Sequence, residues 1–306
     1  MADLPDLLTP SDLLVLNNSR VVPARLLGRR EPSGGHVECL LLRQIDDQRW
    51  DVLMHPGQKM KPGTRASFGE APDRLDAEVL AHHTFGRRTI RLWPSEGRTV
   101  SEVVDAIGHI PLPPYIKRDD GLEDRERYQT IYATRRGSVA APTAGLHLTT
   151  SLLNRLALRG VGRADVTLHV GYGTFEPVRT DVVEEHRLHA EPFEIDAVAA
   201  ETIATAQREG RRIISVGTTT TRTLEAVAAG HGGIVHEASG EASLYIYPGF
   251  RFQVAGGLLT NFHLPKSSLL LLVCAFAGTE LTLEAYRHAV AESYRFYSYG
   301  DAMLIV

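Results

Sequence analysis

Residues 212–229 read Arg-Ile-Ile-Ser-Val-Gly-Thr-Thr-Thr-Thr-Arg-Thr-Leu-Glu-Ala-Val-Ala-Ala, and they predict a strand, a turn and a helix in succession. The apolar run 212–216 is typical of a buried strand, Gly217 permits a tight turn, and residues 222–229 have the apolar spacing of a helix. The rest of the second half alternates in the same way. Helices are expected at 150–159, 197–208, 267–277 and 283–293, and strands at 164–168 and 244–246. This alternation is the signature of an α/β fold.

Residues 21–102 differ in sequence pattern from this second half. Short strand-like runs are separated by turns rich in Gly, Pro and Asp, and they lie at 37–42, 50–54, 77–80 and 89–93. Several short strands at such close spacing predict a small all-β module, most simply a β-barrel. We therefore expect an α/β domain made of residues 1–20 and 103–306, with a β-barrel domain of residues 21–102 inserted into it.

The composition is that of an ordinary globular protein, with 43% hydrophobic and 23% charged residues in 306. A net charge of −4 argues against a surface coated by nucleic acid, but it permits a local basic patch. Cys39 and Cys274 both lie in apolar runs, which predicts free buried thiols in a reducing cytoplasm. The N-terminus has no secretory signal pattern, and the longest apolar run, 269–277, is shorter than the ~20 residues of a membrane span. We expect a cytoplasmic protein with no membrane partner.

The loop at residues 137–147, Gly-Ser-Val-Ala-Ala-Pro-Thr-Ala-Gly-Leu-His, shows no apolar period. Gly145 and Pro142 permit a tight backbone path, while Thr143 and His147 supply polar groups beside it. Such a loop suits a close approach of the backbone to a ligand, although an ordinary turn has the same composition.

Three expected strands of the second half end in polar turns, at residues 169–175, 217–222 and 261–265. Ligands of α/β folds bind at the carboxyl ends of the strands, where such turns meet. Together with the loop 137–147, these turns predict a single polar site.

Two motifs in this region invite other interpretations. Residues 171–173 (Gly-Tyr-Gly) superficially resemble a dinucleotide fingerprint, but Glu176 occupies the place of its third glycine. His186 and His189 lie near acidic residues, yet they lack the zincin spacing and a third ligand at a standard distance. A histidine pair at a pocket edge, or a hydrogen-bonded one, is therefore favoured over a metal site.

Aromatic and basic residues leave two further questions open. The segment 294–301 is dense in aromatic residues, which suits either a core cluster or a stacking wall for a purine. Arginines cluster at 20–30, 87–91 and 135–136. We expect them to bind the phosphates of a nucleic acid only if several of these clusters share one surface.

Seven motifs in order along the chain resemble those of one family, the S-adenosylmethionine:tRNA ribosyltransferase-isomerases of queuosine biosynthesis. The motifs are NNSRVVPARL (17–26), GHIPLPPYI (108–116), RYQTIYA (127–133), AAPTAGLH (140–147), TLHVGYGTF (167–175), TNFHLP (260–265) and YRFYSYGDAM (294–303). They cover nearly the whole chain, so their combination is far more specific than any one of them.

The resemblance implies an α/β barrel-like main domain that carries an inserted small β-barrel. It implies transfer of the ribosyl part of S-adenosylmethionine to 7-aminomethyl-7-deazaguanine at the wobble position of tRNA. Adenine and methionine leave, and epoxyqueuosine remains in the tRNA. The partners are then tRNA and the co-substrate S-adenosylmethionine, with no metal or redox cofactor. The oligomeric state stays open, with a monomer favoured.

This chemistry requires a base with a pKa near neutrality, because the sulfonium acidifies the neighbouring 5′ carbon. The departing adenine also needs an acid, and the attacking amine must be neutral. We expect the base among His147, His169 and His263.

The remaining candidates are expected to bind substrate. The arginines among them are expected to position hydroxyl or phosphate groups of the substrate, and Thr143 and Thr218 are expected to bind its ribose. They are Asn17, Arg20, His109, Tyr115, Thr143, Gly145, Gly171, Thr174, Thr218, Arg222, Asn261 and Tyr297.

The chain departs from the family pattern in four places. The family has a further N-terminal segment, which predicts either a truncated sequence or a shortened paralogue with an open sheet edge. Tyr172 stands where the family has a small or aliphatic residue, Leu148 replaces a common Phe, and residues 220–221 replace Ser-Val. Two alternatives follow: an enzyme that uses S-adenosylmethionine on a small molecule, and a non-catalytic RNA-binding relic.

Overall fold

A computed structural model describes residues 1–175 and 178–306, with the backbone alone for residues 174 and 175. The chain divides into two compact units, a main unit of residues 1–20 and 128–306 and an inserted unit of residues 21–127. In this division the inserted unit extends to Arg127, beyond the residues 21–102 expected for the β-barrel domain. The reason is that α2 (Val100–Ile107) packs on strands of the inserted unit and His109 pairs with Arg25 through the backbone.

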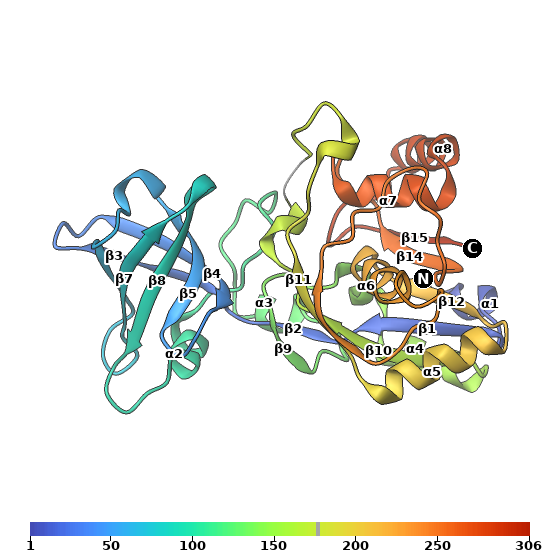
Figure 1. The fold of residues 1–306 in the computed structure, drawn as a ribbon, viewed down its shortest axis with the longest axis horizontal. Coiled ribbons are helices and arrows are strands. Elements are labelled where there is room, and N and C mark those ends of the chain that lie inside the picture. The colour runs from blue at the N-terminus through green and yellow to red at the C-terminus, as the bar shows by residue number, and fades with distance from the viewer. Residues whose placement is uncertain (176–177) are drawn as a thin grey trace. The chain divides into compact units, whose positions relative to one another are not determined.

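The main unit is built on a seven-stranded sheet with the order β13-β11-β10-β1-β12-β14-β15 (Figure 1). Its four central strands run parallel and are β10 (Gly162–Leu168), β1 (Asp12–Asn17), β12 (Arg212–Val216) and β14 (Gly257–Asn261). The outer strands β11 (Glu191–Ile195), β13 (Ala238–Ala242) and β15 (Ala302–Ile305) run antiparallel to their neighbours. A parallel strand covered on both faces reads as a nearly continuous apolar run, as β1 does at residues 13–16.

The main sheet is open, which corrects the barrel-like form that the family resemblance implied. β13 and β15 form its edges, and in the part of the chain that the structure describes no further strand pairs with either. An α/β barrel needs eight parallel strands that close on themselves. Here antiparallel strands flank the four parallel ones.

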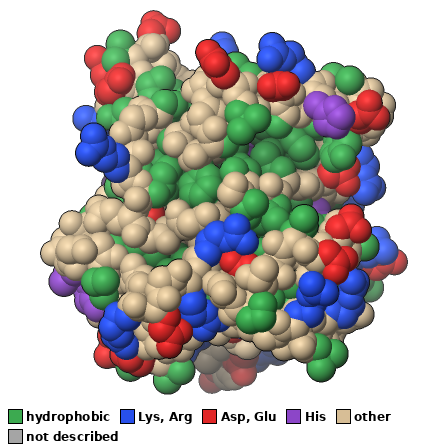
Figure 2. All heavy atoms as spheres, turned by 90° about the vertical axis from the view of Figure 1, so that its right-hand side faces the viewer, with side chains coloured by type: hydrophobic (Ala, Val, Ile, Leu, Met, Phe, Trp, Pro, Cys, Tyr) green, Lys and Arg blue, Asp and Glu red, His purple; other side chains and the backbone are tan. Residues whose placement is uncertain are grey.

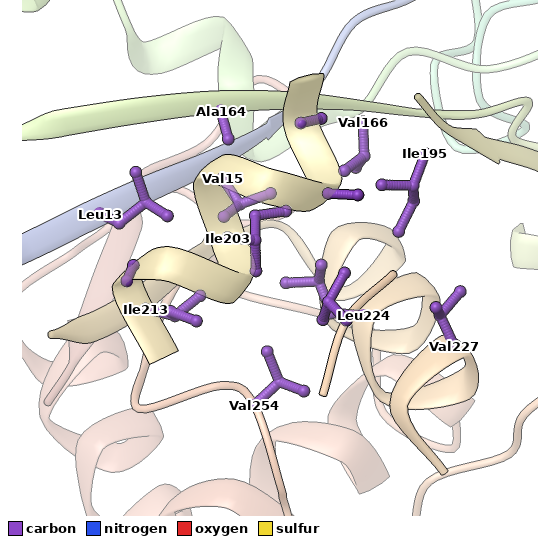
Figure 3. Close-up of a cluster of buried hydrophobic side chains, with 14 of the residues drawn as sticks. Leu13, Val15, Ala164, Val166, Ile195, Ile203, Ile213, Leu224, Val227 and Val254 are labelled. Atoms are coloured by element: carbon purple, nitrogen blue, oxygen red, sulfur yellow. The ribbon is translucent and has the colours of Figure 1, made fainter. Parts of the chain in front are cut away.

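Helices cover both faces of this sheet. They are α1 (Leu4–Leu7), α4 (Thr150–Leu158), α5 (Ala197–Arg208), α6 (Thr218–Ala228), α7 (Ser268–Ala277) and α8 (Thr279–Ala291). The alternation of side chains along β1 shows the two faces: Leu13 and Val15 join the core beneath α5 and α6 (Figure 3), whereas Leu14 and Leu16 join the core beneath α1 and α4.

The side edge of the sheet that is formed by β15 leaves apolar surface uncovered. β15 is half-buried along its length, and Leu269, Leu270 and Leu271 of the strongly apolar α7 are half-buried too. The side of the main unit that carries α1, α8 and the C-terminus in Figure 1 shows hydrophobic side chains gathered in its middle (Figure 2). Among the described residues, no single helix has the length and apolarity to cross a membrane, while the bent pair α7 and α8 meets that test by length and composition only.

Several elements of the main unit differ from the sequence-based expectation, among them α8, which begins at Thr279 instead of residue 283. α6 begins at Thr218, four residues earlier than expected, because Gly217 adopts a φ of 91° and turns the chain from β12 directly into the helix. No strand lies at 244–246, and the edge strand β13 lies at Ala238–Ala242 instead, paired with β11.

The inserted unit contains a closed six-stranded barrel, as expected. Its strands are β3 (Arg25–Glu31), β4 (His36–Gln44), β5 (Arg49–His55), β8 (Arg87–Pro94), β7 (Leu75–His82) and β6 (Arg65–Phe68), in that order around the barrel. Fully buried side chains such as Leu26, Phe68 and Ile90 form its interior. A two-stranded sheet of β2 (Ser19–Val21) and β9 (Arg135–Ser138) and the short helix α3 (Asp124–Arg127) complete the secondary structure used below.

Candidate active site

The loop 137–147 is fastened to the turn that follows β10. The hydroxyl of Ser138 donates to the carbonyl of Ala140 at 2.7 Å and accepts the backbone N–H of Val170 at 2.8 Å. The backbone N–H of Val139 donates to the carbonyl of Val170 at 2.9 Å. The start of the loop therefore lies directly beside the turn that carries His169.

The end of the same loop is joined to the end of β14. Thr143, at the start of the 3-10 turn η3 (Thr143–His147), donates from Oγ1 to Oδ1 of Asn261 at 3.0 Å. The Nδ2 of Asn261 then donates to Nε2 of His147 at 3.0 Å. In this arrangement His147 carries its proton on Nδ1. Burial lowers the pKa of His147, so the imidazole is neutral near pH 7.

Two glycines set the packing around η3. A Cβ on Gly145 would lie 2.1 Å from the hydroxyl oxygen of Tyr132, so this position excludes every larger residue. A Cβ on Gly217 would lie 3.6 Å from that of Ala144, which brings the turn after β12 and the start of α6 against η3. Thr218, the first residue of α6, is buried there.

A buried ion pair connects α6 with the turn after β10. Arg222 donates from Nη2 to Oε2 of Glu191, and the other carboxylate oxygen of Glu191 accepts the backbone N–H of Gly171 at 2.8 Å. Both side chains are only 5% exposed. The Nε of Arg222 has no hydrogen-bond partner among the described residues. Glu191 therefore positions both the guanidinium and the glycine turn.

Sequence reasoning missed Glu191 as a functional residue. It lies two residues after His189, and its carboxylate pairs with Arg222 instead of a metal ion. Among residues 1–175 and 178–306, no group of three or more His, Cys, Asp or Glu is arranged so that it could hold a metal ion. The ring of His186 packs edge-on against Tyr245, and that of His189 lies against Gly173.

His169 follows β10 and is half-buried. A Cβ on Gly137, whose φ is 140°, would lie 2.9 Å from Cε1 of His169, so the glycine makes room for the ring. The Nδ1 of His169 is buried without a partner within the described part of the chain. Burial lowers its pKa, partly opposed by the carboxylate of Glu194. A second neutral imidazole thus lies beside the start of the loop 137–147, with one nitrogen unsatisfied among the described residues.

His263 and Asn17 lie at or just after strand ends, and hydrogen bonds inside the protein occupy Nε2 of His263 and the amide of Asn17. Nε2 of His263 is 2.7 Å from Oγ1 of Thr260, and burial lowers the pKa of this imidazole to about 4. The amide of Asn17 donates to the carbonyl of Leu168 at 2.9 Å and accepts the backbone N–H groups of Leu168 and Ser19. Both residues hold strand ends in place.

The other candidates lie elsewhere or are not fully described. Arg20 is exposed on β2, and the side chain of Thr174 lies outside the described part of the chain. His109 and Tyr115 belong to the inserted unit, where Nδ1 of His109 is 2.8 Å from Oδ1 of Asp120.

The aromatic segment 294–301 packs partly into the main unit. The backbone N–H of Tyr297 donates to the carbonyl of Phe262, and the ring of Phe296 lies 5.2 Å from that of Phe262. Tyr294 and Tyr299 remain exposed. The segment therefore contributes to a core cluster while leaving two rings at the surface.

Comparison with known proteins adds an independent finding. The family model described as queuosine biosynthesis protein matches residues 1–305. An S-adenosylmethionine:tRNA ribosyltransferase-isomerase from Heliobacterium modesticaldum is 51% identical over 99% of this chain and 87% of that protein. The protein of the same name from Carboxydothermus hydrogenoformans is 52% identical with the same coverage. The crystal structure of an S-adenosylmethionine tRNA ribosyltransferase from Thermotoga maritima is similar, with a TM-score of 0.50, 34% identity, and coverage of 99% of this chain and 86% of that one.

Proposed function

Because this chain belongs to the family of queuosine biosynthesis proteins, we propose that it is an S-adenosylmethionine:tRNA ribosyltransferase-isomerase whose active site lies at the carboxyl edge of the main sheet. It transfers the ribosyl part of S-adenosylmethionine to the aminomethyl group of 7-aminomethyl-7-deazaguanine at the wobble position of tRNA. The products are epoxyqueuosine in the tRNA, adenine and methionine. A tRNA substrate also places the enzyme in the cytoplasm.

The observation that carries this proposal is the hydrogen-bond chain from Thr143 through Asn261 to His147. It joins loops that are 118 residues apart in sequence, and each of its members belongs to one of the family's motifs. Polar side chains that the fold brings together from distant turns, at the carboxyl ends of parallel strands, are typical of a ligand site.

His147 and His169 are the proposed candidates for the base that takes the first proton. A neutral imidazole takes the proton from the 5′ carbon, whose carbanion the sulfonium stabilises, while the departing adenine receives a proton from a second group. Burial keeps both imidazoles neutral, as a base requires. We assign His263 to holding the end of β14, because its Nε2 is already bonded to Thr260.

The polar residues around these histidines are proposed to orient the nucleoside. Arg222, whose Nε is unpaired within the described residues, is suited to an oxygen of the substrate, and Thr218 and Thr143 to ribose hydroxyls. Gly171 and Gly145 allow the backbone to approach the ligand. The reaction as proposed needs no metal ion and no redox cofactor, because every step moves protons or leaving groups.

The test uses tRNA that contains 7-aminomethyl-7-deazaguanine and S-adenosylmethionine labelled in its ribose. We expect the label to enter the tRNA with release of adenine. Replacing the catalytic base by Ala removes general base catalysis, worth about 10²- to 10⁴-fold in rate. His147→Ala and His169→Ala are therefore measured separately, with His288→Ala, an exposed residue of α8, as the matched control.

Each other outcome has a definite meaning. Full turnover by both His147→Ala and His169→Ala would exclude a single essential base among them. Adenine release without tRNA would favour an enzyme acting on a small molecule. Binding of tRNA without turnover would favour an RNA-binding relic.

A further inference from the structure

One end of the barrel carries two neighbouring loops without acidic residues. Residues 55–65 connect β5 to β6 through η1 (Gly57–Lys59), and residues 82–87 connect β7 to β8 through η2 (Thr84–Gly86). The sequence contains no Asp or Glu between positions 52 and 69 or between 79 and 95. Basic side chains lie in both loops, with Lys59 and Lys61 exposed and Arg87 half-buried. The local charge is therefore positive, although the whole chain has a net charge of −4.

A buried arginine holds the two loops together. Arg88 is 1% exposed, and its Nε donates to the carbonyl of Met60 at 2.7 Å. Its Nη1 donates to the carbonyl of Arg87 at 2.7 Å, and its Nη2 donates to the carbonyl of Gly57. One guanidinium thus satisfies carbonyls from both loops, which makes them a single preformed surface. We call residues 55–61 and 82–87 the barrel-tip surface.

Phe85 projects from this surface. Its side chain is 81% exposed, and its backbone has φ 54° and ψ 36°, in the left-handed region. A bulky residue in that region is an outlier that glycine or asparagine would relieve. A single exposed apolar residue needs no explanation. An exposed aromatic ring in a strained turn, on two joined loops whose charged residues are all basic, does indicate a ligand.

We propose that the barrel-tip surface binds a single-stranded part of the tRNA, with an unpaired base stacked on Phe85 and phosphates on Lys59, Lys61 and Arg87. An aromatic ring can stack on the face of any base, and basic side chains bind the phosphates of the nucleic-acid backbone. This combination therefore suits unpaired nucleotides. The inference rests on the proposed function, which supplies the tRNA. An acidic protein partner shares the charge requirement but gives no reason for a protruding ring in a strained turn.

The direct test places a fluorescent indole at the tip. Phe85→Trp should retain tRNA binding, and its added fluorescence, taken as the difference from the wild-type chain, should be quenched as unmodified tRNA is titrated in. Leu158→Trp is the matched control, since Leu158 is 89% exposed on α4 of the main unit. We expect no quenching of that indole.

Affinity and salt dependence give the second measurement. Phe85→Ala should weaken tRNA binding about 5- to 150-fold and raise the KM for tRNA, with the KM for S-adenosylmethionine unchanged. The double variant Lys59→Ala/Lys61→Ala should lower the slope of log K against log salt by about 1 to 2. Arg287→Ala, an exposed cation on α8, should leave the slope as it is.

The outcomes separate this inference from the function on which it rests. If the wild-type chain binds tRNA but quenching, affinity and salt slope are all unaffected by changes at the tip, the barrel-tip surface is not the binding surface, and the proposed function stands. If the wild-type chain binds no tRNA in a filter assay, both proposals fail. Unchanged tRNA binding together with capture of an acidic peptide by the tip would assign the surface to a protein.

Discussion

Replacing Glu191 by Gln should destabilise the main unit strongly. The substitution preserves the shape of the side chain but removes the charge that faces Arg222, and both residues are 5% exposed. The guanidinium then stays buried without a counter-charge. An amide also cannot offer acceptors to both Arg222 and the N–H of Gly171, because one of its two heavy atoms is a donor.

The magnitude follows from this burial. Breaking a buried ion pair by removing one partner costs about 3–5 kcal/mol. A loss of 1 kcal/mol lowers the Tm of a domain of 150–250 residues by about 2–4 °C, so the Tm should fall by about 6–20 °C. Glu194→Gln is the matched control on the same strand: its carboxylate is 48% exposed and lies 3.4 Å from Arg135. A surface pair of this kind contributes about 0–1 kcal/mol.

The assay is thermal unfolding followed by circular dichroism for Glu191→Gln, Arg222→Met, the double variant and the control. The double variant should be clearly less destabilised than the sum of the two single ones, since neither charge is then left unpaired. The label-transfer rate of Glu191→Gln, measured well below its Tm, should also fall, because Arg222 and the turn at Gly171 lose their common support. A Tm change no larger than that of Glu194→Gln would refute the reasoning.

Three further predictions concern single residues. Gly145→Ala places a methyl group 2.1 Å from the hydroxyl of Tyr132, and should cost about 1–3 kcal/mol in the free energy of unfolding, part of which Tyr132→Phe restores. Burial alone would raise the pKa of Asp12, but hydrogen bonds, with that from Arg212 first, hold this pKa below 3.8. The ionised carboxylate therefore stabilises the fold above that pH. In urea titrations, the free energy of unfolding of the wild type should exceed that of Asp12→Asn by an amount that shrinks as the pH falls below about 4. Burial lowers the pKa of His263 from 6.5 to about 4, so protonation favours the unfolded chain, and wild type should lose stability between pH 6.5 and 4 more steeply than His263→Gln in the same titrations.

The sequence by itself determined the parts of this protein that rest on local pattern. An apolar run identified β12 with the bounds that the structure shows, and close-set short strands identified the barrel. Polar turns after parallel strands predicted that the loops at 137–147 and 261–265 belong together, because parallel strands present their carboxyl ends at one edge.

Only the tertiary structure decided which polar groups pair and which remain available. His147, His169 and His263 look alike in the sequence, yet Thr260 and the surrounding core occupy His263, while His169 keeps a nitrogen without a partner among the described residues. Glu191 had no local signal as the partner of Arg222, 31 residues away. The open sheet and the early start of α6 were also invisible. The physical reason is that periodicity records which side of an element is buried, whereas hydrogen bonds and ion pairs depend on distances that exist only after the chain has closed.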